Sequence, residues 1–369
     1  MAEVTNYIDR LVAELCPDGV EYRPLVELLA YEQPTKYLVS SKDYDESYPT
    51  PVLTAGKTFI LGYTNETEGI YPASEEEPVI IFDDFTTAFK WVEFPFKAKS
   101  SAMKMLTLKS GTNSLFKYVY YAMQCIVYNS SDHARQWISK YSNIEIPVPP
   151  VEIQEAIVEI LDKFTNLEAE LEAELEARTL QYEYYRDSLF EALDCPRVPL
   201  DSFAKIKNGK TYKEFGAGNI PVYGSGGIMT YVDRSSYDKP TVLIPRKGSL
   251  GNLFYLEEPF WNVDTIFYTE IDEEQVIPKF LYYFLKTAHL EDLNTAGGVP
   301  SLTQKVLNKV LIPVPSLEEQ QRIVDILDRF DALTSSLSEG LPAELAARRS
   351  QYEYYRDQLL SFPRKGENQ

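Results

Sequence analysis

Several short groups of residues could in principle do chemistry, and none has the spacing that its chemistry needs. Asn208-Gly209-Lys210-Thr211 ends like a phosphate-binding loop, but Ala204 stands where that loop requires glycine. Its backbone could therefore not cradle phosphates. Gly224-Ser225-Gly226-Gly227 resembles a dinucleotide fingerprint, yet no helical pattern follows it. A glycine turn is the favoured interpretation of that run.

Asp83 and Asp84 follow a strand-like run and could hold a metal ion or act as a base. No Glu-x-Lys partner follows them, and the matching place in the second half of the chain carries Arg246-Lys247. A polar turn after a buried strand is favoured instead. His133 and His289 are isolated, the cysteines are scattered, and no methyl-donor or nucleotide-hydrolysis motif is visible. The chain is predicted to be non-catalytic and to bind no metal, which argues against an autonomous nuclease or methyltransferase.

Basic residues are better placed for binding nucleic acid. They form clusters around Lys99, around Lys207 and at Arg246. Arginine can fork onto guanine O6 and N7, whereas lysine mainly pairs with phosphate. A solvated surface side chain is the alternative for each of them. Arg246 is the strongest candidate, because it leaves a strand beside a glycine turn that lets the backbone approach a ligand. The predicted DNA-binding residues are Lys57, Thr86, Thr87, Lys97, Lys99, Lys104, Lys207, Lys210, Arg246, Lys247, Ser249 and Asn252.

Net charge does not exclude DNA, because the charge is unevenly spread. The 369 residues carry a net charge of −20. Residues 146–195 hold 13 acidic and 3 basic residues, while residues 196–311 hold 13 of each. Binding depends on a local positive face. The three scattered cysteines, the lack of a signal-peptide core in residues 1–20 and the lack of a long apolar run predict a cytoplasmic location.

An internal duplication organises the elements that must position these residues. Ile146-Pro147-Val148-Pro149 returns as Ile312-Pro313-Val314-Pro315, and QYEYYRD occurs at Gln181–Asp187 and again at Gln351–Asp357. Gln154 and Phe164 likewise recur as Gln320 and Phe330 at one constant offset. Two matched runs in the same order indicate a duplicated helical segment.

The first copy, Glu152–Leu193, is predicted to form one long helix. Its apolar residues recur at alternating steps of four and three, which is typical of a coiled-coil seam. The repeated Leu-Glu-Ala-Glu unit adds one stutter to that seam. In the second copy, Gly340 and Pro342 are predicted to break or kink the helix.

Two segments flanking the central helix share a pattern of short strands followed by a helix. Residues 21–145 end in a helical stretch at Leu115–Ile126, and residues 196–311 contain the parallel stretch Phe280–Leu290. A short amphipathic helix is predicted at Tyr7–Leu15. Its sequence weakly resembles the end of the central copy, which suggests that the chain starts partway through a repeat unit, in the circular order helix fragment, domain, helix, domain, helix. The strand-like runs of the first segment are Pro51–Thr54, Val79–Phe82 and Ala102–Leu108.

Four runs carry a family resemblance: IPVPSLEEQQRIVDILDRF at Ile312–Phe330, its partner from Ile146, Val242–Ser249 and Gly297–Leu302. With them the chain resembles, over essentially its whole length, the DNA-specificity subunit of type I restriction–modification systems. The Leu-Glu-Ala-Glu repeat is similar to the spacer repeat of one branch of that family.

The resemblance implies one target-recognition domain for each half of a split, asymmetric double-stranded DNA site. It also implies two methylation subunits and, in the nuclease form, two restriction subunits as partners. No cofactor is implied for this chain itself. The resemblance places S-adenosylmethionine in the methylation partner, and ATP and Mg in the restriction partner where one is present.

The predicted fold class is α+β, with two globular α/β target-recognition domains separated by two long antiparallel coiled-coil helices in a pseudo-twofold internal repeat. The predicted domains are 1–20, an N-terminal helical segment; 21–146, target-recognition domain 1; 147–195, the central spacer helix; 196–312, target-recognition domain 2; 313–362, the C-terminal helix; and 363–369, a tail.

The duplicated helices are also the predicted docking surface for partner subunits, because their tyrosine-rich ends expose more aromatic surface than two helices need to bury. The Leu-Glu-Ala-Glu run could be a plain spacer, and a helix of fixed length between two recognition domains acts as a ruler. The alternative function is a coiled-coil scaffold that organises partners without reading DNA. The predicted partner-binding residues are Gln154, Tyr182, Tyr184, Tyr185, Gln320, Tyr352, Tyr354 and Tyr355.

Overall fold

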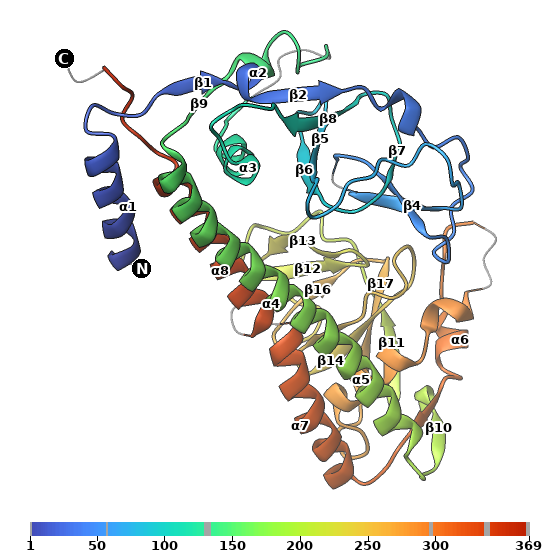
Figure 1. Ribbon diagram of the computed structural model, residues 1–369. Coiled ribbons are helices and arrows are strands. Elements are labelled where there is room, and N and C mark those ends of the chain that lie inside the picture. Colours follow the sequence, from blue (N-terminus) through green and yellow to red (C-terminus); the bar gives the residue numbers. More distant parts are fainter. Residues whose placement is uncertain (1, 57, 129–133, 295–297, 336–339, 367–369) are drawn as a thin grey trace. The chain divides into compact units, whose positions relative to one another are not determined.

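The computed structural model describes residues 2–56, 58–128, 134–294, 298–335 and 340–366, in two compact units (Figure 1). Unit 1 comprises Met1–Ala169 with Ala347–Gln369, and unit 2 comprises Glu170–Ala346. The central helix α4 (Val151–Glu191) contributes one part to each unit. Of the residues singled out in the sequence, Lys57 and His133 lie outside the described ranges.

Unit 1 is built from short strands and helices. Its strands are β1 (Tyr22–Pro24), β2 (Leu29–Glu32), β3 (Thr50–Leu53), β4 (Ile60–Thr64), β5 (Val79–Asp83), β6 (Phe89–Val92), β7 (Lys97–Ala98), β8 (Met103–Leu108) and β9 (Glu145–Pro147). Its helices besides the part of α4 are α1 (Ala2–Leu15), α2 (Leu25–Leu28), α3 (Phe116–Gln124) and the 3-10 turns η1 (Pro34–Tyr37) and η2 (Tyr141–Asn143). The strands form sheets of order β2-β8-β5-β6 and β4-β3-β7 and a ribbon β1-β9.

Unit 2 repeats this topology strand for strand. Its strands are β10 (Arg197–Pro199), β11 (Ala204–Asn208), β12 (Ile220–Gly224), β13 (Gly227–Val232), β14 (Thr241–Pro245), β15 (Phe254–Leu256), β16 (Trp261–Asn262), β17 (Ile266–Ile271) and β18 (Leu311–Pro313). Its other elements are η3 (Leu200–Ser202), α5 (Pro278–Thr287), η4 (Leu290–Leu293), α6 (Gln304–Leu307), α7 (Leu317–Thr334) and the start of α8 (Leu341–Leu359). The sheet orders β11-β17-β14-β15 and β13-β12-β16 and the ribbon β10-β18 match those of unit 1.

Each four-stranded sheet is covered on both faces, which explains why Val79–Phe82 of β5 and Val242–Ile244 of β14 are apolar without interruption. In β5, Ile80 and Phe82 pack with α3, whereas Val79 and Ile81 pack in the cluster that contains Leu53 of β3. The same alternation recurs in β14 of unit 2. The strand and helix predictions for both globular segments are therefore confirmed within a few residues at each end.

The duplicated helices form as predicted, including the break in the second copy. α7 ends at Thr334 and α8 begins at Leu341, directly after Gly340, whose φ of +86° only glycine adopts readily. In unit 1 the first part of α4 runs antiparallel to α8, since Glu168 pairs with Arg349 at 2.6 Å while the earlier Phe164 contacts the later Tyr352. Among the helices in the described ranges, none combines the length and the apolar composition that a bilayer crossing needs.

Candidate nucleic-acid interface

Three strand ends of unit 2 meet at one edge of its four-stranded sheet. Asn208, at the end of β11, pairs with Phe267 of β17, and Pro245, at the end of β14, pairs with Ile266 of the same strand. The loops that leave β11 and β14 therefore start side by side. We call the five predicted DNA-binding residues on these loops the strand-end cluster: Lys210, Arg246, Lys247, Ser249 and Asn252.

Arg246 is held by its own loop and by β17. Its Nη1 donates to the Asp264 carbonyl at 3.3 Å, and its guanidinium carbon lies 5.9 Å from the centre of the Phe267 ring. The backbone N–H groups of Arg246 and Lys247 both donate to the Thr265 carbonyl, at 2.8 and 3.2 Å. Lys247 is exposed and Arg246 partly so. Cations on a loop fixed in this way lose little conformational entropy when they bind an anionic ligand.

The other cluster members lie on the same surface. Lys210 and Ser249 are exposed, and Asn252 donates from Nδ2 to the Ser225 carbonyl at 3.1 Å, which ties the β14 loop to the turn of the β12–β13 hairpin. Lys207 lies on β11 itself, with its ammonium group 3.2 Å from the Glu270 carboxylate. The apolar runs made the strand ends recognisable in the sequence, and the role of these residues in binding DNA stays a prediction.

The glycines near the cluster have structural roles. A Cβ on Gly209 would lie 2.0 Å from the Val263 carbonyl oxygen, so close approach of two backbone segments, and not phosphate binding, explains Asn208-Gly209-Lys210-Thr211. Gly224–Gly227 forms the turn of the β12–β13 hairpin, with Gly227 at φ +108°, which confirms the glycine-turn interpretation.

In unit 1, two predicted DNA-binding lysines belong to the core and are removed from the predicted interface. Lys104 is 0% exposed, its ammonium lies 2.8 Å from the Asp84 carboxylate, and it donates to Gln33 Oε1 at 3.2 Å. Lys97 is 3% exposed and pairs with Glu66 at 2.6 Å. If a buried lysine left such a partner to bind a phosphate, the carboxylate would remain buried without a counter-charge, which costs free energy. Lys104 stands between Met103 and Met105, and this apolar setting was the missed signal of burial.

Lys99, Thr86 and Thr87 remain candidates in unit 1. Lys99 is partly buried and donates to the Tyr44 hydroxyl at 2.8 Å. Thr86 is exposed, and Thr87 sits at φ +59°, in a turn where Asp83 Oδ1 accepts the backbone N–H of Thr86. Asp83 therefore acts as a turn cap. In the described part of the chain no three His, Cys, Asp or Glu side chains gather as a metal site.

The two units place different chemistry at one topological position. Asp84 follows β5 just as Arg246 follows β14, and the strand registers match Lys104 with Phe267. Unit 1 thus has a buried Asp84–Lys104 ion pair where unit 2 has a guanidinium over an aromatic ring. Among the described residues, this position therefore presents an accessible cation in unit 2 and a buried ion pair in unit 1.

Two predicted partner-binding residues, Gln154 and Gln320, are buried and belong to the framework instead. Both are 0% exposed. Gln154 accepts the Leu115 N–H at 2.9 Å and donates to Pro149, and Gln320 accepts the Ile277 N–H at 2.8 Å and donates to Pro315. Each glutamine thus joins the start of its own helix to the start of α3 or α5, and neither side chain is available for a partner.

The tyrosines of the two QYEYYRD runs divide into buried and exposed positions. Tyr184 is 70% and Tyr354 58% exposed, and Tyr185 is 44% exposed. Tyr182 is buried, at 6%, and Tyr352 and Tyr355 are partly buried. Tyr184 and Tyr354 therefore stand out from their helices at equivalent places.

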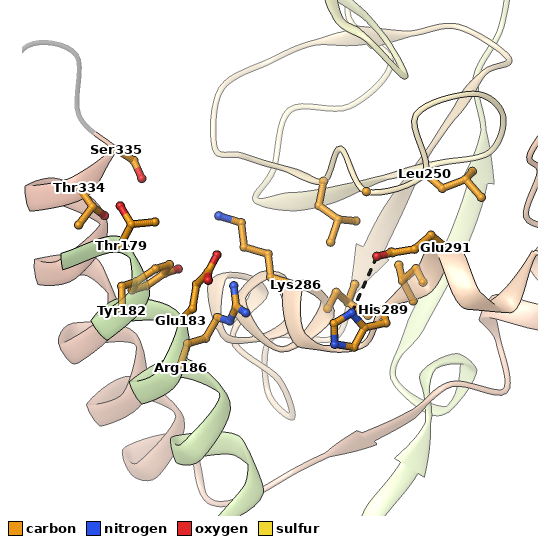
Figure 2. A pocket seen from close by; sticks show the side chains of 14 residues that line it. Thr179, Tyr182, Glu183, Arg186, Leu250, Lys286, His289, Glu291, Thr334 and Ser335 are labelled. Atoms are coloured by element: carbon orange, nitrogen blue, oxygen red, sulfur yellow. Dashed lines mark ion pairs between the residues drawn. The ribbon is translucent and has the colours of Figure 1, made fainter. Parts of the chain in front are cut away.

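A polar pocket of about 350 Å³ lies beside Tyr182 in unit 2 (Figure 2). Lys286, Arg186 and Glu183 line it, and the Tyr182 hydroxyl is buried without a hydrogen bond to the described residues. In unit 1 the corresponding Tyr352 hydroxyl donates to Gln124 at 2.6 Å. Leu115 and Ile277 are equivalent, because each donates its N–H to the buried glutamine of its unit. Counting along α3 and α5 from these two residues makes Lys286 the equivalent of Gln124. The pocket therefore lies at the position where, in unit 1, the Gln124 amide accepts a hydrogen bond from Tyr352.

The duplicated frame, the strand-end cluster and the paired helices define a class of protein. The family model for the type I restriction modification DNA specificity domain matches residues 17–177 and 194–347, and the chain belongs to this family. It is thus a non-catalytic DNA-recognition subunit.

Individual relatives agree over nearly the full length. The chain is 44% identical over 401 residues to the type I restriction enzyme EcoR124I/EcoR124II specificity subunit of Escherichia coli, covering 97% of this chain and 98% of the relative. It is 30% identical over 377 residues to a putative type I specificity subunit of Haemophilus influenzae, covering 93% and 96%. In fold it is similar to the type I restriction–modification S subunit of M. genitalium, with a TM-score of 0.59, 19% identity and 93% and 96% coverage.

Proposed function

We propose that unit 1 and unit 2 each read one half of a bipartite, asymmetric double-stranded DNA site, with α4 fixing the distance between the half-sites. The observation that carries this proposal is the difference at one shared position, an Asp84–Lys104 pair in unit 1 and Arg246 over Phe267 in unit 2. Two identical frames with different loop chemistry are what an asymmetric target requires.

Local charge supports DNA as the ligand despite the net charge of −20. Lys210, Arg246 and Lys247 gather at one sheet edge, where a guanidinium can bind guanine bidentately and the ammonium groups can pair with phosphates. The glutamates on the middle of α4 are exposed and lie along a helix, at Glu170, Glu172 and Glu174. A local cluster of cations can bind DNA even when most of the excess acidic residues lie on another element of the chain.

The exposed tyrosines support docking of methylation subunits. Tyr184 and Tyr354 occur once in each copy of the repeat, so we propose two methylation subunits, one for each copy. Two restriction subunits join where the nuclease form exists. The methylation subunits would carry S-adenosylmethionine and the restriction subunits ATP and Mg, and this chain would contribute none of them.

The test uses the chain assembled with its methylation subunits and maps the methylated sites. Arg246→Ala should relax one position of one half-site and weaken specific binding by about 1–3 kcal/mol. Lys163→Ala, which removes an exposed cation of α4, is the matched control and should leave the motif unchanged. Methylation without sequence preference by the wild-type complex would instead support a scaffold that does not read DNA.

A further inference from the structure

The three-stranded sheets of the two units carry the same irregularity. In the β3–β4 hairpin, Val52 pairs with Gly62 and Leu53 with Ile60, which leaves Leu61 as an extra residue. In the β12–β13 hairpin, Val222 pairs with Thr230 and Tyr223 with Ile228, which leaves Met229 as an extra residue. Each hairpin therefore contains a β-bulge at the same place. β-bulges redirect side chains and are frequent beside functional sites.

The bulges expose apolar side chains in pairs. Ile60 and Leu61 are 38% and 40% exposed, and Ile228 and Met229 are 51% and 57% exposed. In a regular strand, neighbouring side chains point to opposite faces; here two neighbours are both accessible. β4 and β13 are also edge strands, where exposed positions are usually charged. We call these four residues the bulge pairs.

In unit 2 the bulge pair adjoins the strand-end cluster. A Cβ on Gly224 would lie 2.8 Å from Met229 Sδ and 3.3 Å from Thr265 Oγ1, so the Met229 thioether lies close to Thr265. The Thr265 carbonyl accepts the N–H groups of Arg246 and Lys247. Met229 and the backbone that carries Arg246 and Lys247 therefore adjoin the same residue, Thr265.

In unit 1 the bulge pair is linked to the remaining lysine candidate. A Cβ on Gly62, the residue after Leu61, would lie 2.8 Å from Cβ of Tyr44. The Tyr44 hydroxyl accepts a hydrogen bond from Lys99 at 2.8 Å. In unit 1 the bulge pair is thus linked through Tyr44 to a cation that follows β7, whereas in unit 2 the cations follow β14.

We propose that Ile60 and Leu61 in unit 1, and Ile228 and Met229 in unit 2, enter a groove of the half-site and make apolar contacts with its bases. The proposal rests on the proposed DNA-reading function and adds specificity residues to it. Two apolar features of DNA fit such a pair, the thymine 5-methyl group in the major groove and the stacked faces of a base step that a wedge can separate. Pairing with a strand of another chain fits less well, because a bulge interrupts the row of free backbone groups.

The experiment maps methylated sites for Leu61→Ala and Met229→Ala, each assembled with wild-type methylation subunits. Leu61→Ala should relax one half-site and Met229→Ala the other, with a loss of discrimination at one base pair of up to roughly 5- to 150-fold. The salt dependence of binding should stay as in the wild type, since no phosphate contact is lost. Met229→Leu should restore most of the discrimination. Val26→Ala, another exposed apolar residue, is the control.

Two further measurements distinguish contact with a thymine methyl group from insertion between stacked bases. Replacing each half-site thymine by uracil should reproduce the Met229→Ala effect if the methyl group is contacted. A 2-aminopurine beside the site should brighten with wild-type protein and not with the variant if the pair is a wedge. Unchanged half-sites in both variants, with folding intact by thermal unfolding, would overturn the proposal. If Arg246→Ala still relaxes its half-site in that case, DNA reading itself stands.

Discussion

The ring of Phe164 stacks on the ring of Tyr355, with centroids 5.7 Å apart and planes inclined by 24°. Phe330 and Tyr185 repeat this contact in unit 2, at 5.7 Å and 30°. In each case the phenylalanine comes from the beginning of one repeat copy and the tyrosine from the end of the other copy. Each unit therefore contains a ring contact between the two copies of the repeat.

The buried side chains of Gln154 and Gln320, at the starts of the two helices, are predicted to stabilise the fold. Gln154→Leu and Gln320→Leu should each destabilise the chain by about 3 kcal/mol, because several buried backbone groups lose their partners. Glu155→Ala and Gln321→Ala alter exposed neighbours and should change the free energy of unfolding little. Urea denaturation of the four variants decides it. Equal stability of Gln154→Leu and Glu155→Ala would show that the hydrogen bonds of Gln154 do not stabilise the fold.

The two equivalent tyrosines beside α3 and α5 should respond oppositely to loss of the hydroxyl. Tyr352→Phe removes the hydrogen bond to Gln124 and should cost about 1 kcal/mol. Tyr182→Phe removes a buried hydroxyl that has no partner among the described residues, so it should be neutral or stabilising. Thermal unfolding of the two variants provides the comparison, and a larger loss for Tyr182→Phe would show that its hydroxyl is bonded.

Alkaline pH should destabilise unit 1 through its buried tyrosines. Burial raises the pKa of Tyr118 and of Tyr141. A raised pKa means that the folded state holds the phenol proton more tightly than the unfolded chain does. This stabilisation is complete below pH 10 or so and is lost as the pH rises above the unfolded pKa, at up to about 1.4 kcal/mol per pH unit for each group. Urea denaturation between pH 8 and 11 measures the slope, and Tyr141→Phe should reduce it.

Subunit association tests the exposed tyrosines. Tyr184→Ser and Tyr354→Ser should weaken binding of methylation subunits, because large aromatic side chains at the centre of an interface carry much of its energy. Sedimentation of the mixed subunits measures this, with the near-ultraviolet circular dichroism of the free chain as the folding check. Assembly at wild-type affinity by both variants would place the docking surface elsewhere.

The length of α4 tests the ruler. Deleting Leu171–Glu174 removes four residues, or about 6 Å of helix and roughly 40° of rotation beyond a full turn. Since DNA rises about 3.4 Å per base pair, the methylated half-sites should lie roughly one to two base pairs closer together. Their sequences should stay the same, because no recognition loop is altered. Methylation mapping shows the spacing, and changed half-sites with an unchanged spacer would rule out this role.

The sequence by itself determined the elements and their repetition. The apolar runs Val79–Phe82 and Val242–Ile244 predicted β5 and β14, because a strand covered on both faces has no polar side. The four–three periodicity and Gly340 predicted α4 and the break between α7 and α8. These signals are local, since each depends on residues within one or two turns of one another.

Only the tertiary structure decided which charged and polar residues reach the surface. Lys104 is buried because Asp84, distant in sequence, supplies its counter-charge, and Gln320 is buried because Ile277 offers an unpaired N–H. Arg246 stays accessible because its partner is an aromatic face and a carbonyl, which leave the guanidinium free to bind further. Composition and spacing cannot distinguish these cases, because the energy of a buried polar group depends on partners that only the folded chain brings within reach.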